Sequence, residues 1–267
     1  MMKKQPLLSL LLVLMSMMWA SNVSAGVSIA GNYTSQTGYI TGKGITGSVH
    51  YNAENKVLTL DNAHITYIYT VLENGDEGLK LVVKGDCSLT SERTGASAVY
   101  CNYSMTITGG GTLTIESPVA AFNSNTGKPS TLTIEGCTVV AHGGNYGFLG
   151  RAKSTLVIRN ATVKAQGTHF GSIYQWQDIK FEGCKIEQPA DATIGYDPSG
   201  KCVTKDGEVV TSEVVIVPNA TGIAHPTTDA STPKDGVYTI DGVYLGTHVE
   251  SLPRGVYIVG GKKVIKN

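Results

Sequence analysis

The sequence predicts an all-β chain, built as a right-handed parallel β-helix of about six rungs with β caps at both ends and a small C-terminal β-hairpin module. One short phrase recurs about every two dozen residues, a period typical of solenoid repeats. Within each copy apolar and polar residues alternate, which indicates strands rather than helices. The 32 glycines suit many turns and disfavour long helices.

A targeting segment is expected over residues 1–25. Lys3 and Lys4 supply the charged start, residues 7–15 are apolar, and small residues precede Gly26. The alternative is a membrane anchor, but the apolar run is shorter than the roughly 20 residues that a spanning helix needs. We therefore expect cleavage before Gly26, export, and no membrane span in the mature chain.

The β-helix domain is expected over residues 26–217. Residues 26–56 alternate like strands with turns between them and should cap the N-terminal end of the stack. The six copies of the phrase begin the rungs, and they occupy residues 57–65, 79–89, 105–115, 132–139, 156–163 and 179–186. A second short strand follows in each repeat, at residues 98–99, 121–122, 147–149 and 172–173. Three strands and three turns per repeat are typical of a parallel β-helix.

Equivalent positions of the repeats predict three columns along the stack. Small residues that include Cys87, Cys137 and Cys184 should be buried beside a turn, too far apart across two rungs for a disulfide. Outward polar positions put Glu135, Arg159 and Glu182 side by side. We favour charge pairing there over a catalytic carboxylate set, because the alternating signs neutralise each other. The next column contains only Gly and Asn, the residues that best tolerate a left-handed backbone: Asn62, Gly85, Gly109, Gly136, Asn160 and Gly183.

The C-terminal part divides into a cap, a linker and a tail. Residues 201–204 and 209–217 are expected as strands around the turn 205–208, a hairpin that caps the stack. Residues 218–235 are rich in Pro, Thr, Ala and Asp and are expected as a linker. Residues 236–267 return to strand alternation and predict two hairpins, a module too short to bury a large core.

Aromatic residues beside the second strands are the best candidates for a ligand site. They are Tyr100, Tyr103, Tyr146, Phe170, Tyr174 and Trp176. Aligned repeats put Tyr146 next to Phe170, and strand alternation puts Tyr174 and Trp176 on one side of their strand. A row of exposed rings can stack on sugar faces while polar neighbours hold hydroxyls. The alternative is that part of this set packs in the core or in turns.

Composition and motifs disfavour several other functions. The 21 basic and 21 acidic residues balance, whereas nucleic-acid binders show a basic excess. The sequence has no CxxC pair, His-rich spacing, nucleotide-binding glycine motif or GxSxG motif that would predict a metal, a cofactor or a catalytic serine. His142 and His169 are expected in roughly equivalent turns, as surface residues.

Two stretches resemble known bacterial families. Residues 47–51, Gly-Ser-Val-His-Tyr, followed by residues 57–65, resemble the opening of exported surface proteins described as carbohydrate-binding-domain-containing or adhesin-like β-helices. The tail, with Leu-Pro-Arg-Gly-Val-Tyr-Ile-Val over residues 252–259 and then Gly261, Lys262 and Lys263, resembles the C-terminal sorting domain of Bacteroidetes type IX secretion, although it is shorter. These resemblances imply export to the outer cell surface, or to the periplasm if the tail does not act, and contact between the tail and the secretion machinery.

Three functions remain open. The first is a non-catalytic surface protein that binds glycan or mediates adhesion through Tyr100, Tyr146, Phe170, Tyr174 and Trp176. The second, suggested by fold analogy alone, is a polysaccharide lyase or hydrolase of the pectate-lyase type. The third is a structural module that contacts only protein partners. The first is favoured, because the sequence contains no acidic cluster of the kind that such enzymes need.

Overall fold

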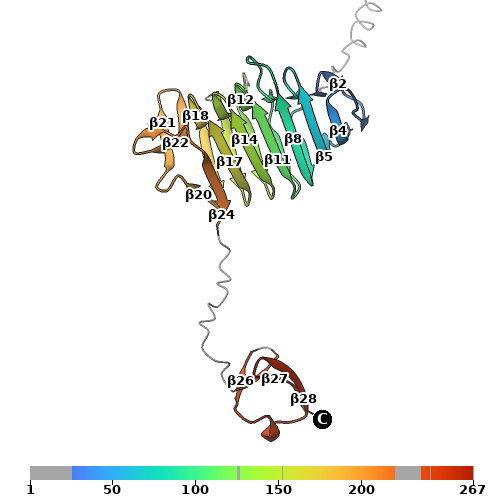
Figure 1. Cartoon of the computed structure of the whole chain (residues 1–267), viewed down its shortest axis with the longest axis vertical. Coiled ribbons are helices and arrows are strands. Elements are labelled where there is room, and N and C mark those ends of the chain that lie inside the picture. The colour runs from blue at the N-terminus through green and yellow to red at the C-terminus, as the bar shows by residue number, and fades with distance from the viewer. Residues whose placement is uncertain (1–25, 125–126, 152, 220–235, 241, 267) are drawn as a thin grey trace, which may run out of the picture. The chain divides into compact units, whose positions relative to one another are not determined.

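The computed structural model describes residues 26–124, 127–151, 153–219, 236–240 and 242–266. The expected signal segment and most of the expected linker lie outside these ranges. The chain divides into two compact units, residues 1–219 and 220–267. The larger unit confirms the predicted all-β parallel β-helix (Figure 1).

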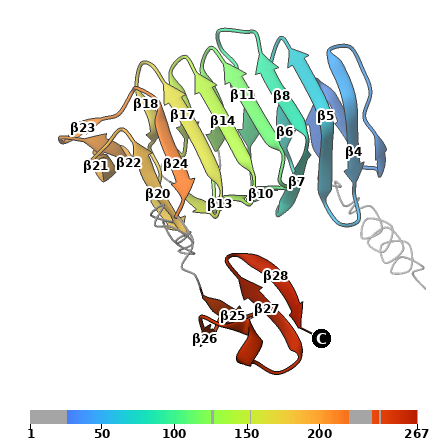
Figure 2. The ribbon, with the colours of Figure 1, turned by 60° about the horizontal axis from the view of Figure 1, so that its bottom comes forward.

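Three walls of parallel strands make the solenoid, and Figure 2 shows the rungs stacked side by side. The first wall contains β7 (Leu79–Lys84), β10 (Met105–Thr108), β13 (Ser130–Glu135), β16 (Ser154–Arg159) and β19 (Asp178–Glu182). The second contains β8 (Asp86–Ser91), β11 (Thr112–Ser117), β14 (Thr138–Gly143) and β17 (Thr162–Gly167). The third contains β6 (Leu72–Asn74), β9 (Val99–Cys101), β12 (Ala120–Ser124), β15 (Tyr146–Leu149) and β18 (Gly171–Tyr174).

The first rung begins with one long strand, β5 (Val57–Tyr67), which pairs in parallel with both β7 and β8. The third wall contains five parallel strands, so the solenoid has about five turns rather than the six expected. The sixth copy of the repeat leaves the ladder after β19. Its second strand, β20 (Cys184–Gln188), pairs antiparallel with β24 (Val214–Pro218), which lies between β17 and β20.

Apolar side chains at equivalent positions of successive rungs stack inside the solenoid. In the first wall Leu81 pairs in register with Ile107, Ile107 with Ile134, and Ile134 with Ile158. All four are fully buried. Each rung therefore covers the apolar side chains of its neighbour, and no helix is needed to complete the core.

The predicted column of left-handed turn residues is confirmed. Positive φ values occur at all six positions: Asn62, Gly85, Gly109, Gly136, Asn160 and Gly183. This backbone conformation turns the chain from the first wall into the second at every rung, which explains why only Gly and Asn occupy the column.

Antiparallel strands close both ends of the stack. At the N-terminal end, β1 (Val27–Ile29) pairs with β6 and with β2 (Asn32–Thr34), while β4 (Ile45–Asn52) pairs with β5 and with β3 (Gly38–Tyr39). At the other end, β22 (Gly200–Lys205) pairs with β21 (Thr193–Asp197) and with β23 (Glu208–Val209). The predicted hairpin around residues 205–208 is thus present, but its second strand is short. Residues 214–218 instead join the solenoid wall as β24.

The smaller unit is a four-stranded antiparallel sheet in the order β26-β25-β27-β28. Its strands are β25 (Val237–Thr239), β26 (Tyr244–Gly246), β27 (Gly255–Val259) and β28 (Lys262–Lys266), and a 3-10 turn, Val249–Ser251, precedes β27. Both predicted hairpins form. Val237 and Tyr257 are buried, whereas Val256 and Ile265, which pair with each other, are exposed.

Candidate functional site

Three aromatic rings stack into a ladder at the C-terminal end of the third wall. The ring centroids of Tyr146 and Phe170 lie 5.3 Å apart, and those of Tyr146 and Tyr174 lie 5.7 Å apart, with 22° between the ring planes in both pairs. The sequence prediction that Tyr146 lies beside Phe170 is therefore confirmed. Phe170 is 54% exposed, while the other two rings are half-buried. Tyr146 lies between the other two rings, and Phe170, the more exposed of the two end rings, is the most accessible ring of the ladder.

Backbone register and one glycine hold this ring ladder in place. Tyr146 begins β15 and lies in register with Gly171 of β18. The N–H of Phe170 donates to the carbonyl oxygen of Asn145 at 3.1 Å, which fixes Phe170 beside Tyr146. A Cβ on Gly171 would lie 3.0 Å from Tyr174 Cβ and 2.9 Å from Val209 Cγ1, so a larger residue there would push Tyr174 aside.

Asp197 anchors the polar end of the ring ladder. Tyr174 Oη donates to Asp197 Oδ1 at 2.8 Å, and the N–H of Ser199 donates to the same oxygen at 2.9 Å. Partial burial is the main cause of the raised pKa of Tyr174. The Ser199 N–H, followed by the Tyr174 hydroxyl, lowers the pKa of Asp197. Asp197 is thus a carboxylate at neutral pH. A side-chain hydrogen bond from Ser199 lowers this pKa further, and because the carboxylate is only partly buried and has about four acceptor sites, it can also accept a hydrogen bond from a ligand.

The expectation that Trp176 joins an exposed aromatic row is wrong. Its side chain is 0% exposed and packs in the hydrophobic core. Gln175 has a φ of 61°, which breaks the strand alternation and turns Trp176 away from the face that Tyr174 occupies. A Cβ on Gly150 would lie 2.4 Å from the indole, and Trp176 forms an antiparallel bridge with Lys201. Trp176 therefore closes the C-terminal end of the core and cannot stack on a ligand.

Tyr100 lies apart from the ring ladder. It occupies the same position in its strand as Tyr174, but Asn123 and Leu149 lie between them in register, and both are buried. Tyr103 is exposed in the turn that follows β9, the strand that contains Tyr100. The structure thus brings together Tyr146, Phe170 and Tyr174, whereas Tyr100 lies on β9, which β12 separates from the Tyr146 strand β15.

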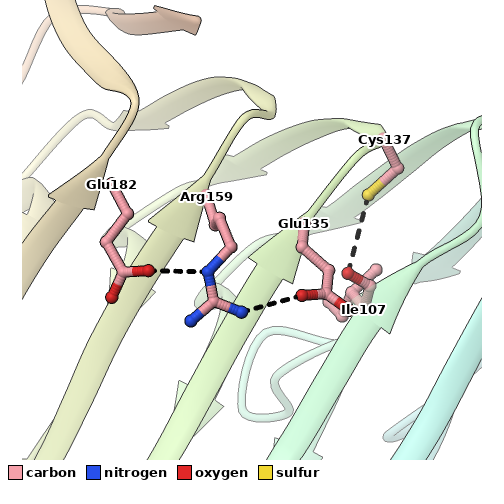
Figure 3. A network of polar contacts seen from close by, with 5 residues as sticks. All are labelled: Ile107, Glu135, Cys137, Arg159 and Glu182. Atoms are coloured by element: carbon pink, nitrogen blue, oxygen red, sulfur yellow. Dashed lines mark hydrogen bonds and ion pairs between the residues drawn. The ribbon is translucent and has the colours of Figure 1, made fainter.

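The predicted outward charge column forms an ion-paired ladder on the first wall (Figure 3). Arg159 Nε lies 2.6 Å from Glu182 Oε2, and Arg159 Nη1 lies 3.0 Å from Glu135 Oε2. The hydrogen bond that Arg159 donates to Glu182, with a further contribution from the one it donates to Glu135, raises the pKa of Arg159 above its ordinary value. Both carboxylates are occupied by the guanidinium. This arrangement fits cross-strand charge pairing and does not leave a free pair of carboxylates for catalysis.

The predicted column of small buried residues is confirmed, and its cysteines are free thiols. Cys87, Cys137 and Cys184 are buried, as are Cys101 and Cys202 elsewhere in the solenoid. Burial raises the pKa of Cys137 to about 11, and it raises the pKa of Cys101 to about 11 as well. Cys137 Sγ contacts the carbonyl oxygen of Ile107 at 3.7 Å, as Figure 3 also shows. The thiols of Cys101 and Cys137 are therefore protonated at neutral pH and poorly suited to nucleophilic or metal chemistry. The described residues contain no group of three or more His, Cys, Asp or Glu side chains placed to hold a metal ion.

The two histidines do not occupy equivalent positions. His142 lies in β14 and pairs with Gln166, whereas His169 follows β17 and its Nδ1 contacts the carbonyl oxygen of Gly144 at 2.8 Å. His142 Nε2 lies 3.8 Å from Glu213 Oε2 beside a shallow groove of about 350 Å³. Glu116 lines the same groove, but nothing there matches a catalytic triad or a metal site.

Sequence reasoning missed a groove of about 600 Å³ at the N-terminal end of the solenoid. Tyr67, Ile68, Lys43 and Glu92 line it, and they come from three separate segments. The Arg93 guanidinium lies 4.8 Å from the ring centroid of Tyr69, close by in sequence. The Tyr-Ile-Tyr run at residues 67–69, soon after the first repeat, could have indicated an exposed aromatic surface. The groove itself forms only because residues of the N-terminal cap lie against this run.

The fold and these surfaces define a parallel β-solenoid protein with an exposed aromatic ladder near one end. No family model, curated protein or solved structure matches this chain. The described residues contain no helix long and apolar enough to cross a membrane.

Proposed function

We propose that this chain is an exported, non-catalytic surface protein that binds glycan on the ring ladder of Tyr146, Phe170 and Tyr174. The observation that carries the proposal is the stacked ladder itself, which has the exposed ring of Phe170 at one end and the Asp197 carboxylate beside Tyr174 at the other. A sugar ring stacks its C–H face on Phe170, while the Asp197 carboxylate at the Tyr174 end of the ladder accepts a hydrogen bond from a hydroxyl elsewhere on the same glycan. An apolar face flanked by a few polar groups is the usual chemistry of such sites.

The absence of free paired carboxylates in the charge ladder favours binding over hydrolysis. Arg159 engages Glu135 and Glu182, so neither can act as an unhindered acid or base. A lyase or hydrolase activity stays an outcome of the test below: release of soluble oligosaccharide from a bound polysaccharide would show it. A role that involves only protein partners is the outcome if no glycan binds.

The C-terminal unit is proposed to act in delivery rather than in ligand binding. The tail resembles a type IX sorting domain, and the compact sheet of β25 to β28 gives the secretion machinery a folded element to recognise. Removal of residues 236–267 is expected to leave glycan binding unchanged and to retain the chain in the periplasm of a secreting host. Efficient surface delivery of the shortened chain would contradict this assignment.

The binding proposal is tested with residues 26–267 on a broad glycan array. Phe170→Ala removes the exposed ring, and Tyr39→Ala is the matched control, because Tyr39 is also highly exposed but lies in the N-terminal cap. Binding that is lost in Phe170→Ala and kept in Tyr39→Ala supports the site. No glycan bound by the unmodified chain sinks the proposal, and loss in the Tyr39 variant alone would move the site to the N-terminal end.

A further inference from the structure

A tyrosine–carboxylate pair is buried inside the N-terminal cap. Tyr51 of β4 donates its hydroxyl hydrogen bond to Asp76 Oδ2, and Asp76 is only 3% exposed. Within the described ranges no Lys, Arg or His side chain lies at ion-pair distance from Asp76. A buried carboxylate with no cation nearby is costly, which raises the question of what balances its charge.

The pairing of β1 with β6 brings Gly26 beside Gly75, the residue that directly precedes this carboxylate. Val27 lies opposite Asn74, and the N–H of Gly75 donates to the carbonyl oxygen of Gly26 at 2.9 Å. A Cβ on Gly75 would lie 3.6 Å from the nitrogen of Gly26, so this nitrogen lies next to the backbone that leads directly into Asp76.

Tyr33 and the backbone of Thr34 also enclose Gly26. A Cβ on Gly26 would lie 3.1 Å from Tyr33 Oη and 2.2 Å from the carbonyl oxygen of Thr34, so only glycine fits there. Burial, then Asp76 and then Tyr33 raise the pKa of Tyr51 well above its ordinary value, which places Tyr33, Tyr51 and Asp76 in one electrostatic neighbourhood. Gly26 itself is buried.

We propose that cleavage of the signal segment completes this cap: the new α-ammonium group of Gly26 forms a buried ion pair with Asp76. The inference rests on the export part of the proposed function. Hydrolysis of the peptide bond between Ala25 and Gly26 consumes one water, leaves a carboxylate on the released segment and leaves an amine on Gly26, which takes up a proton. The uncharged amide nitrogen of Gly26 thus becomes a cation, which can serve as the counter-ion that Asp76 otherwise lacks.

This pairing makes the processed chain more stable than the unprocessed one. Before cleavage, Asp76 relies on the Tyr51 hydroxyl and remains without a counter-ion. After cleavage, a charge-assisted hydrogen bond ties β1 to the residues that follow β6, and these elements seal the N-terminal end of the solenoid. The final closure of the cap is therefore coupled to export.

The test compares two purified chains, one that begins at Gly26 and one that begins at Asn22 and so keeps four natural residues before Gly26. Both end at Asn267. We expect the longer chain to have a folding equilibrium constant lower by about tenfold or more at pH 7, the scale of a hydrogen bond to a charged group. With Asp76→Asn in both chains, the difference should vanish. Equal stability of the two unmodified chains would overturn the proposal.

A second measurement guards against an Asp76→Asn variant that folds poorly. The rate at which an acylating reagent labels the α-amine of Gly26 at pH 7 should be at least tenfold slower in the folded chain than in the urea-unfolded chain. An α-amine that reacts equally fast in both states would show that it is free, and the proposal would fail. N-terminal sequencing of the exported protein should give Gly-Val-Ser-Ile; another first residue overturns the proposal even if export and glycan binding stand.

Discussion

At the scale of single residues, Trp176 shows how one backbone angle redirects a side chain. The strand β18 ends at Tyr174, and the positive φ of Gln175 then turns the indole into the end of the core. The Trp176 N–H is buried without an acceptor among the described residues, so its contribution comes from apolar packing alone. The residue acts as a plug for the C-terminal end of the solenoid.

Replacement of this plug is expected to be costly. Trp176→Ala should lower the free energy of unfolding by about 3–5 kcal/mol, through lost burial and the cavity left behind. Urea denaturation followed by circular dichroism measures the change. Phe170→Ala is the control, because its exposed ring should cost less than about 1 kcal/mol. A Trp176→Ala chain as stable as the unmodified chain would show that the indole does not close the core.

The buried thiols give a pH-dependent prediction. Because the folded-state pKa of Cys101 and of Cys137 is about 11, above the ordinary value of 9.0, both thiols stay protonated in the folded chain while unfolded chains ionise. Their contribution to stability is therefore complete below about pH 9 and declines as the pH rises toward 11. Iodoacetamide at pH 8 should label neither thiol in the folded chain and both in urea, as read by mass spectrometry. Rapid labelling of the folded chain would contradict their burial.

At the scale of elements, the left-handed turn residue of each rung sets the corner between the first and second walls. Gly136 has a φ of 61°, and no atom lies within 4 Å of where its Cβ would be. Gly183 has a similar φ, but a Cβ there would lie 2.3 Å from Asn160 Oδ1. Gly136 thus isolates the backbone effect from any steric clash.

Gly136→Ala should cost about 1–2 kcal/mol, the penalty of a left-handed conformation for a residue with a Cβ. Gly95→Ala is the matched control, because Gly95 also has open space around it but no positive φ. That variant should be neutral or slightly stabilising. The midpoints of urea unfolding report both changes. Equal midpoints for the two variants would contradict the explanation that the Gly and Asn column is required by its left-handed backbone.

Much of this corner and wall architecture could be predicted from the sequence. The Gly and Asn column, the Glu135–Arg159–Glu182 ladder and the Tyr146–Phe170 contact all follow from aligned repeats, since equal positions stack in register. Aligned repeats could not predict the burial of Trp176, the insertion of β24 between β17 and β20, or the N-terminal groove. These depend on the ends of the stack, where the repeat stops and non-repeating segments pack against it.

At the scale of the whole molecule, each of the two compact units has buried residues of its own. The solenoid buries long apolar columns, whereas the C-terminal sheet buries little beyond Val237 and Tyr257. A chain of residues 26–219 should therefore keep the unfolding free energy of the solenoid within about 0.5 kcal/mol. Calorimetry of the full and shortened chains measures this, and a large loss of stability on shortening would show that the solenoid depends on its tail.

The account depends most on the exposed ring of the ladder. The decisive measurement is the affinity of the Phe170→Ala chain for the strongest glycan found on the array, beside the Tyr39→Ala chain, by titration calorimetry. The account predicts that Phe170→Ala raises the dissociation constant at least tenfold, a loss of about 1.4 kcal/mol of binding free energy, and that Tyr39→Ala leaves it unchanged. Unchanged affinity of the Phe170→Ala chain, with its fold intact, would contradict a sugar site on the ring ladder.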